Sequence, residues 1–161
     1  MHIEVVTEAD LPDLLPLMRA YCDFYGVQPS DEELLALARA LLADPHCEGF
    51  QLIARDAGRA VGFATVYWNW STLAAARTAI MNDLFVHSDA RGSGLAELLI
   101  EECRVRAGRR GATSLGWQTA KDNRRAQTVY ERVGAKREEW VDYSLDTAPG
   151  AGNEQRLRQH G

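Results

Sequence analysis

Cysteine is scarce in this sequence, and its placement excludes two classes of small protein. Cys22, Cys47 and Cys103 are odd in number, lie far apart and form no Cys-x-x-Cys pair. Such a pattern argues against a disulfide framework and against a structural zinc site. The histidines show no metal-ligand spacing either. We therefore expect no bound metal and a reducing compartment, the cytoplasm.

The chain also lacks a long apolar run, a leader-like start and an excess of basic residues. Without an apolar run we expect no membrane association, and without a leader we expect no targeting. Eighteen Lys and Arg residues against 23 Asp and Glu residues give a net charge of −5. This sign disfavours tight binding to nucleic acid or to anionic lipid, whereas a cationic small molecule is tolerated.

The length of 161 residues is that of one ordinary domain, and no repeat or linker divides the chain. We predict a single domain over residues 1–146. Residues 147–161 contain the stretch Ala-Pro-Gly-Ala-Gly and a polar end, which predict a flexible C-terminal tail.

Helical and strand patterns alternate along the chain, as in α/β proteins. Helices are predicted over 11–25, from a capping box at Ser30 to about residue 43, from Leu95 to Gly108, and over 123–133. Strands are predicted over residues 2–6, 50–55, 60–68, 77–86, 113–119 and 140–145.

A glycine-rich turn joins the predicted strand 77–86 to the helix that follows it. Its sequence is Arg91-Gly92-Ser93-Gly94-Leu95-Ala96. Glycines let the backbone approach an anion, and the free N–H groups and dipole of a helix start favour negative charge. The pattern is neither a Walker loop nor Gly-x-Gly-x-x-Gly, and a tight turn alone can also explain the glycines. The loop is therefore a candidate phosphate site.

This loop, the strand Asn82-Asp83-Leu84-Phe85-Val86 and the segment from Asn123 to Ala135 together resemble the GNAT superfamily of acetyltransferases. The resemblance spans most of residues 3–145. Within the superfamily, the chain is most similar to the diamine (spermidine/spermine) acetyltransferases and the yeast histone/polyamine acetyltransferases. It implies a GNAT fold, a strongly twisted mixed central sheet with helices on both faces, and acetyl transfer from acetyl-CoA (coenzyme A) to an amine within a ternary complex.

The resemblance also implies a cofactor site. In it, the strand Leu84, Phe85 and Val86 pairs with the pantetheine arm through its backbone, and the N–H groups from Arg91 to Ala96 hold the pyrophosphate. Asn123 contacts the cofactor from the next helix. Tyr130, seven residues further on, faces the same way and protonates the departing thiolate. A structural alternative is that Tyr130 belongs to a core stripe with its apolar neighbours.

The general base is not evident from the sequence. Many relatives place a glutamate on the strand before the phosphate loop, but counting back by twos from Val86 gives Leu84, Asn82 and Ile80 on that face. Asn82 could order a water molecule that carries the proton away. Asp83 points to the opposite face unless the strand bulges there. Its role can be structural or catalytic, and we favour the structural one.

The acceptor pocket is expected between the first two helices and the central strands, with Tyr21, Asp23, Tyr25 and Trp68 as its candidate residues. Aromatic faces and one acid suit a cation, although such residues also form cores and dimer interfaces. A polyamine or another small primary amine is the favoured acceptor. The alternatives are a protein lysine or N-terminal amine, and a non-catalytic acyl-CoA-binding module, which has no need of Tyr130. Relatives of this subgroup pair, so a homodimer is also expected.

Overall fold

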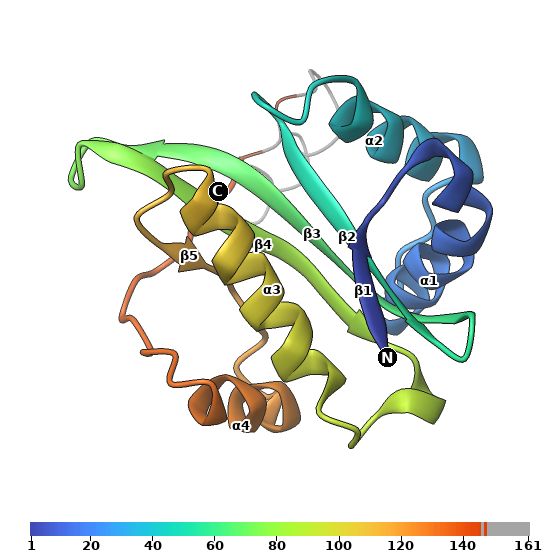
Figure 1. Cartoon of the computed structure of the whole chain (residues 1–161). Helices are drawn as coiled ribbons and strands as arrows, with labels where there is room; N and C mark the ends of the chain where they lie inside the picture. The colour runs from blue at the N-terminus through green and yellow to red at the C-terminus, as the bar shows by residue number, and fades with distance from the viewer. Residues whose placement is uncertain (146, 148–161) are drawn as a thin grey trace, which may run out of the picture.

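The computed structural model describes residues 1–145 and 147. Its centre is a five-stranded sheet in the order β1-β2-β3-β4-β5. The first four strands pair antiparallel and β5 runs parallel to β4, so the sheet is mixed, as predicted (Figure 1). The strands are β1 (His2–Val5), β2 (Gly49–Asp56), β3 (Arg59–Ser71), β4 (Ala76–Val86) and β5 (Leu115–Gly116).

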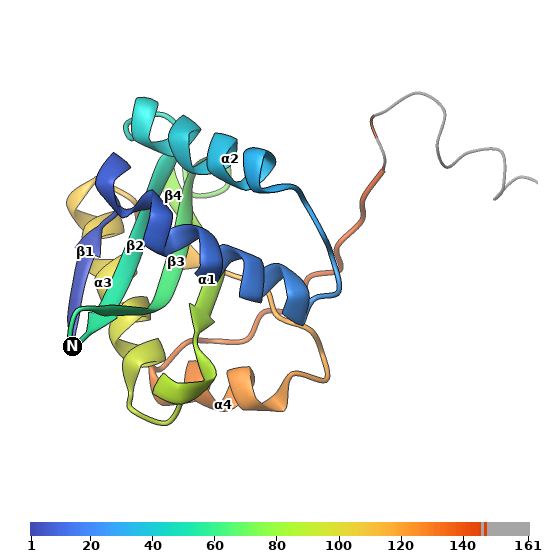
Figure 2. The same ribbon diagram turned by 90° about the vertical axis from the view of Figure 1, so that its right-hand side faces the viewer.

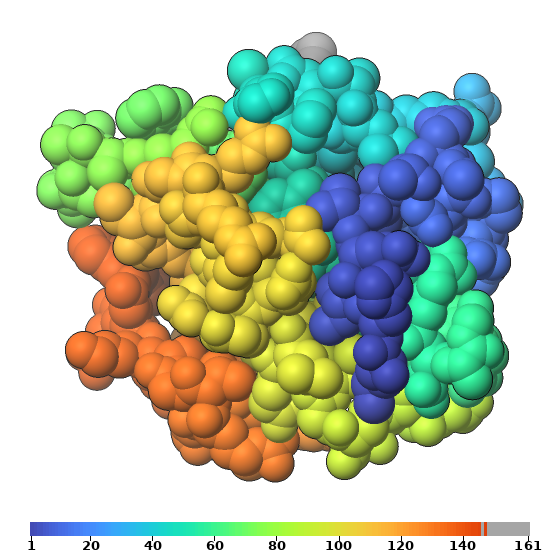
Figure 3. Space-filling model, in the orientation of Figure 1, coloured from blue at the N-terminus to red at the C-terminus, as the bar shows by residue number. Residues whose placement is uncertain are grey.

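Helices cover both faces of this sheet. α1 and α2 lie on one face, α3 lies on the other, and α4 lies beside the beginning of α3 (Figures 1 and 2). In the space-filling view, α3 covers the centre of its face, between α4 and β1 (Figure 3). The helices are α1 (Leu11–Phe24), α2 (Asp31–Ala43), α3 (Leu95–Arg109) and α4 (Arg124–Arg132), with short 3-10 turns η1 (Glu8–Asp10) and η2 (Ser88–Ala90).

Two apolar cores hold these layers together. The core under α1 and α2 contains Leu14 and Leu34 from the helices and Phe63 and Phe85 from the sheet. The core under α3 contains Leu52, Val66, Met81, Leu95 and Leu99. Because strand side chains alternate between faces, each central strand contributes to both cores, which confirms helices on both faces of the sheet.

The last two strands stay paired over a short distance only. β4 and β5 are in register at Ala79 with Leu115 and at Ile80 with Gly116. In the part of the chain that the structure describes, no strand pairs with residues 81–86 on this side. The second half of β4 therefore has a free edge, and the cavity described below opens along it.

A bulge in β4 changes which side chains share a face. Thr65 of β3 pairs with Asp83, but the next residue, Val66, pairs with Met81, so Asn82 is the extra residue. Before the bulge Met81 faces α3, and after it Leu84 and Val86 do. Counting by twos from Val86 back to Ile80 was therefore wrong, because the alternation restarts at Asn82.

The prediction of a last strand over 140–145 was also wrong. These residues are described without strand pairing, and Trp140, Val141, Tyr143 and Leu145 are 74%, 74%, 92% and 93% exposed. Alternation makes a strand only where a sheet edge pairs with it, and β5 spans two residues rather than the predicted seven. The segment is attached instead by Gln118, whose amide donates to Asp142 at 2.6 Å. The predicted tail lies, apart from Thr147, outside the described residues.

Candidate active site

A cavity of about 840 Å³ lies between the free edge of β4, the glycine-rich loop, the start of α3 and α4. The end of α1 closes it on one side through Tyr21, Phe24 and Tyr25. Every residue that the sequence predicted for the cofactor lines this cavity: Leu84, Phe85, Val86, Arg91, Gly92, Ser93, Gly94, Leu95, Ala96, Asn123 and Tyr130. The fold thus brings together residues from four separate segments of the chain.

The loop has the backbone conformation that an anion cradle needs. Gly92 and Gly94 both have φ of 82°, in the left-handed region that other residues rarely adopt. Gly94 is the N-cap residue of α3, so the first N–H groups of this helix have no partner within it. The hydroxyl of Ser93 donates to the carbonyl oxygen of Ala90 at 2.7 Å and holds the turn closed. The residues that carry these unpaired N–H groups, Leu95, Ala96 and Glu97, all line the cavity.

The backbone of Leu84 and Val86 is directed toward the free edge of β4. The N–H of His87 donates to Val61 of β3 at 2.8 Å. Because hydrogen-bonding direction alternates along an antiparallel strand, the groups of Val86 and then of Leu84 point away from β3. The Val86 carbonyl accepts a bond from Arg91 Nε at 3.1 Å. The edge can pair with an extended amide chain as an added strand would.

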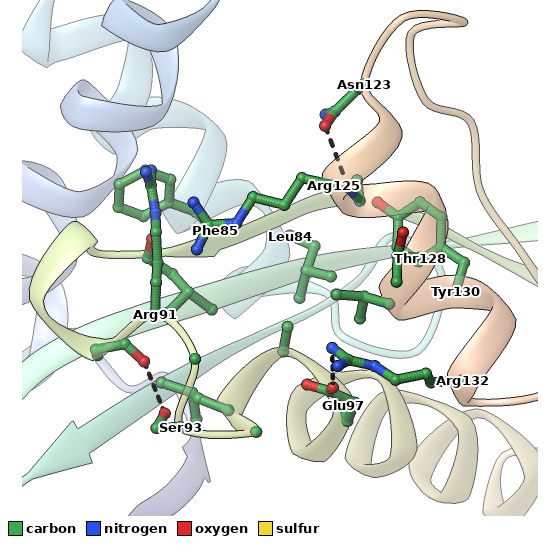
Figure 4. A pocket seen from close by; sticks show the side chains of 18 of the residues that line it. Leu84, Phe85, Arg91, Ser93, Glu97, Asn123, Arg125, Thr128, Tyr130 and Arg132 are labelled. Atoms are coloured by element: carbon green, nitrogen blue, oxygen red, sulfur yellow. Dashed lines mark hydrogen bonds and ion pairs between the residues drawn. The ribbon is translucent and has the colours of Figure 1, made fainter.

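Positive charge gathers at this cavity although the chain is acidic overall. Arg91 from the loop and Arg125 from α4 extend toward one another across it (Figure 4). Arg132 of α4 pairs with Glu97 of α3 at 2.6 Å and thereby links the two helices. Sequence reasoning missed Arg125 and Arg132, because surface arginines on a helix carry no specific signal. Their spacing of seven, the same as between Asn123 and Tyr130, places them on one helix face.

Tyr130 lies where the main cavity continues toward α1. Its ring packs edge-on against Trp117 with centroids 5.3 Å apart. Burial raises the pKa of Tyr130 above its ordinary value. The phenol therefore stays protonated at neutral pH and can donate a proton. Asn123 begins α4 as its cap, with its side-chain oxygen accepting from the Ala126 N–H at 3.2 Å.

A second, smaller cavity of about 20 Å³ adjoins the first. Tyr21, Tyr25, Leu84 and Tyr130 line both. Its remaining lining residues are Met81, Asn82, Trp117 and Gln118. The sequence had indicated Tyr21, Tyr25 and Asn82 but not Trp117 or Gln118, which lie just after β5 and meet β4 only through the fold.

Two of the predicted acceptor residues lie elsewhere. Asp23 is an exposed residue on α1 and lines neither cavity. Trp68 lines neither cavity, because its ring packs against Phe50 and its indole N–H donates to the Pro45 carbonyl at 2.9 Å. Neighbouring positions on a strand or helix face different directions, so the aromatic cluster of the sequence divides between the cavity and the core.

The same part of the sheet contains a carboxyl group without a basic partner. Asp83 follows the bulge on β4, opposite the buried Thr65 of β3. Burial raises the pKa of Asp83, and hydrogen bonds from Thr65, Asn82 and Tyr21 offset this in part. The Asn82 amide donates to it at 3.0 Å.

Two kinds of feature are absent from residues 1–145 and 147. In that range no group of three or more His, Cys, Asp or Glu side chains is arranged to hold a metal ion. Nor does that range contain a helix that is long and apolar enough to cross a membrane.

Comparisons with known proteins agree with this geometry. The model of the Acetyltransferase (GNAT) family matches residues 14–135. The Uncharacterized N-acetyltransferase YhfO of Bacillus subtilis is 32% identical over 147 residues, which cover 91% of this chain and 97% of that protein. The D-amino-acid N-acetyltransferase HPA3 of Saccharomyces cerevisiae is 32% identical over 112 residues, 68% of each chain.

Among solved structures, the crystal structure of a probable acetyltransferase has a TM-score of 0.82 and 27% identity. The match covers 93% of this chain and 100% of that chain. The family model covers well over half of the chain and includes β4, the glycine-rich loop and α4. The chain therefore belongs to the GNAT family of acetyltransferases and is an N-acetyltransferase that uses acetyl-CoA.

Proposed function

We propose that this enzyme acetylates a primary amine on a small molecule, with a polyamine as the favoured class, by direct transfer in a ternary complex. The observation that supports this most strongly is the junction of the two cavities at Tyr130 and Leu84. A long cavity with phosphate-binding features meets a small aromatic one there. A space of about 20 Å³ holds one group the size of a water molecule or an ammonium head, so the ammonium end of an amine can meet an acyl donor at this junction.

The residues present fit acetyl-CoA. The free edge of β4 matches the amides of the pantetheine arm, and the loop at Gly92–Gly94 with Arg91 matches the pyrophosphate. Arg125 extends over the same cavity and adds a further cation for the phosphates. When bound, acetyl-CoA supplies the thioester whose acetyl carbon the amine attacks.

Tyr130 is the proposed general acid. As the new N–C bond forms and the C–S bond breaks, the sulfur takes the phenolic proton and leaves as a neutral thiol. The proton that the attached nitrogen loses then restores Tyr130. Because burial raises its pKa, the Tyr130 phenol keeps this proton at neutral pH and is able to transfer it to the sulfur as the C–S bond breaks.

The small cavity favours an amine that has no carboxylate of its own. Its described lining consists of aromatic and apolar side chains with the amides of Asn82 and Gln118, and no Lys or Arg is among them. Aromatic faces attract an ammonium group, whereas a carboxylate would lose its hydration without gaining a cationic partner. The yeast relative's name gives D-amino acids as its substrates, so amino acids form the contrasting class.

The first experiment is a thiol-release assay with acetyl-CoA against spermidine, spermine, diamines, D- and L-amino acids, aminoglycosides and a lysine-rich peptide. Turnover with polyamines and not with amino acids is expected. A preference for amino acids or for the peptide would contradict the proposed acceptor class.

The reducing cytoplasm is the proposed location, since Cys22, Cys47 and Cys103 are all free thiols.

A Tyr130→Phe variant tests the acid. We expect kcat to fall by about 10²-fold or more, because the thiolate must leave without a proton, while acetyl-CoA affinity stays close to that of the parent enzyme. Steady-state rates and isothermal titration calorimetry measure the two quantities. Tyr143→Phe is the matched control, since Tyr143 is 92% exposed and lines neither cavity. Unchanged turnover in Tyr130→Phe would remove Tyr130 as the acid.

A further inference from the structure

The acceptor amine must lose a proton before it attacks, and the residues at the β4 bulge suggest where that proton goes. An alkylammonium group has a pKa of about 10, so at neutral pH nearly all of the amine is protonated and unreactive. The small cavity itself is lined by no carboxylate and no histidine. A group that can take up this proton must therefore lie outside the lining of the small cavity.

That group is Asp83, beneath Tyr21. The ring of Tyr21 packs edge-on against Phe63 and Phe85, with centroids 5.8 and 6.3 Å away. Asp83 and Phe85 are two residues apart on β4 and therefore face α1 together. Burial first, and then the nearby Asp83 carboxyl, raises the pKa of Tyr21, so the phenol and the carboxyl group lie close together. Tyr21 also lines both cavities. The tyrosine thus connects the acid to the space where an amine can bind.

The bulge is what makes this arrangement possible. With uninterrupted alternation, Met81 and Asp83 would share the face toward α3, because they are two residues apart. The extra residue Asn82 reverses the alternation, so that Met81 packs against α3 whereas Asp83 lies with Phe85 on the α1 side. Asn82 then lines the small cavity and donates to Asp83.

A charged, partly buried carboxylate needs compensation, and here hydrogen bonds alone supply it. Gln51 donates to the Thr65 hydroxyl at 3.1 Å, and Thr65 lies opposite Asp83 in the register of β3 and β4. The titratable groups that face Asp83 are Tyr21 and Cys22 from α1 and Tyr67 from β3. None of them is a cation. A bound ammonium would therefore supply the missing positive charge.

We propose that Tyr21 accepts a proton from the acceptor ammonium while it passes its own hydroxyl proton to Asp83. The step converts an ammonium and a carboxylate into a neutral amine and a carboxylic acid, and Tyr21 ends as a neutral phenol. Because both charges disappear together, the low-dielectric site favours the transfer. Asp83 later releases this proton to solvent. In this relay Tyr21 contacts the substrate, whereas Asp83 acts through Tyr21. The relay rests on the proposed amine acetylation.

The pH dependence of kcat/KM separates this relay from a structural role. In the parent enzyme the relay operates when Asp83 is ionised, so kcat/KM should rise with pH through the raised pKa of Asp83 and then level off. In Asp83→Asn the rate should follow the free amine and climb about tenfold per pH unit up to the pKa of the amine. At pH 7 the loss should be about 10²-fold or more.

Tyr21→Phe is the second variant, because it removes one hydroxyl and leaves the aromatic packing in place. It should give the same steep profile, and the double variant should lose no more than either single variant, since both interrupt one relay. Tyr67→Phe is the matched control: Tyr67 faces Asp83 from β3 but lines neither cavity. It should keep the plateau and stay within about twofold of the parent rate.

Calorimetry with acetyl-CoA shows that each variant is folded and binds the donor. A plateau at the same pH in Asp83→Asn, or losses that multiply in the double variant, would overturn the relay and leave the proposed function standing. A parent enzyme that binds acetyl-CoA but acetylates no amine would overturn the proposed function, and the relay with it.

Discussion

Gly94 combines a left-handed backbone conformation with a position in the lining of the main cavity. Its φ is 82°, and an added Cβ would have no heavy atom within 4 Å, so a side chain there projects into open space at the cavity lining. We expect Gly94→Glu to weaken acetyl-CoA binding by at least about 100-fold, because a carboxylate would oppose the phosphates. Isothermal titration calorimetry measures this.

Gly58 provides the control for that substitution. It lies in the turn between β2 and β3 with φ of 83° and with no heavy atom within 4 Å of an added Cβ, and it lines neither cavity. Gly58→Glu therefore carries the same backbone strain and the same charge away from the site. Normal affinity in Gly94→Glu, or an equal loss in both variants, would contradict the phosphate role of the loop.

Single residues were predictable from sequence where the chemistry demands a particular residue type. A left-handed turn needs Gly92 and Gly94, so these two positions stand out in the sequence, whereas the resemblance to the GNAT superfamily indicated Tyr130. Trp117, Gln118 and Arg125 fit many surroundings, and the fold alone decides that they line a cavity. Trp68 and Asp23 were placed from proximity along the chain, which does not fix the direction of a side chain.

At the scale of elements, Arg55 links β2 to the start of α1. Its guanidinium donates to Asp10 and Asp13, both at 2.7 Å, and its side chain is 18% exposed. Arg55→Met should lower the free energy of unfolding by about 1–3 kcal/mol, because two carboxylates lose a charged donor in a partly buried place. Urea denaturation at pH 7 measures this difference.

A low pH should reduce the difference in the free energy of unfolding between the parent protein and the Arg55→Met variant. Hydrogen bonding from Thr7 first, and then from Arg55, lowers the pKa of Asp10 in the folded chain. A lowered folded-state pKa contributes stability above the unfolded value, and this stability is lost as the pH falls through the folded value. The stability difference between parent and Arg55→Met should therefore be smaller at pH 3 than at pH 7. An equal difference at both would mean that packing, not charge, dominates.

Helices and strands were predictable where the residues of the element itself supply the signal. The capping box at Ser30 begins α2 as expected, with Glu33 donating its N–H to the Ser30 hydroxyl at 3.2 Å. The bulge at Asn82 and the unpaired segment 140–145 were not predictable, because each depends on a neighbouring strand. A bulge reflects the register with β3, and a terminal strand exists only where an edge pairs with it.

At the scale of the molecule, the overall charge and the local charge have opposite signs. The chain has a net charge of −5, yet Arg91, Arg125 and Arg132 line the cavity and only Glu97 opposes them. The Debye length is about 8 Å at physiological ionic strength, so distant acids are screened, whereas an arginine at the cavity would act directly on a bound phosphate. The negative net charge therefore argued against nucleic acid as a partner, but it did not argue against a cofactor that carries phosphate groups.

The described site ends well before the C-terminus. The lining residues of both cavities lie between Tyr21 and Arg132. A chain that ends after Thr147 should therefore keep its acetyl-CoA affinity and its kcat within about twofold of the parent values. Calorimetry and the thiol-release assay measure both quantities, and a larger loss of either would place part of the site beyond residue 147.

A chain that ends after Glu139 provides the contrast, because it also removes Asp142. The Gln118 amide, which lines the small cavity, donates to Asp142 and would lose this partner. The KM for the amine should then rise while acetyl-CoA affinity stays the same, since the main cavity contains neither residue. If both truncated chains behave alike, segment 140–145 does not position Gln118. A rise confined to the shorter chain assigns the exposed segment to acceptor binding.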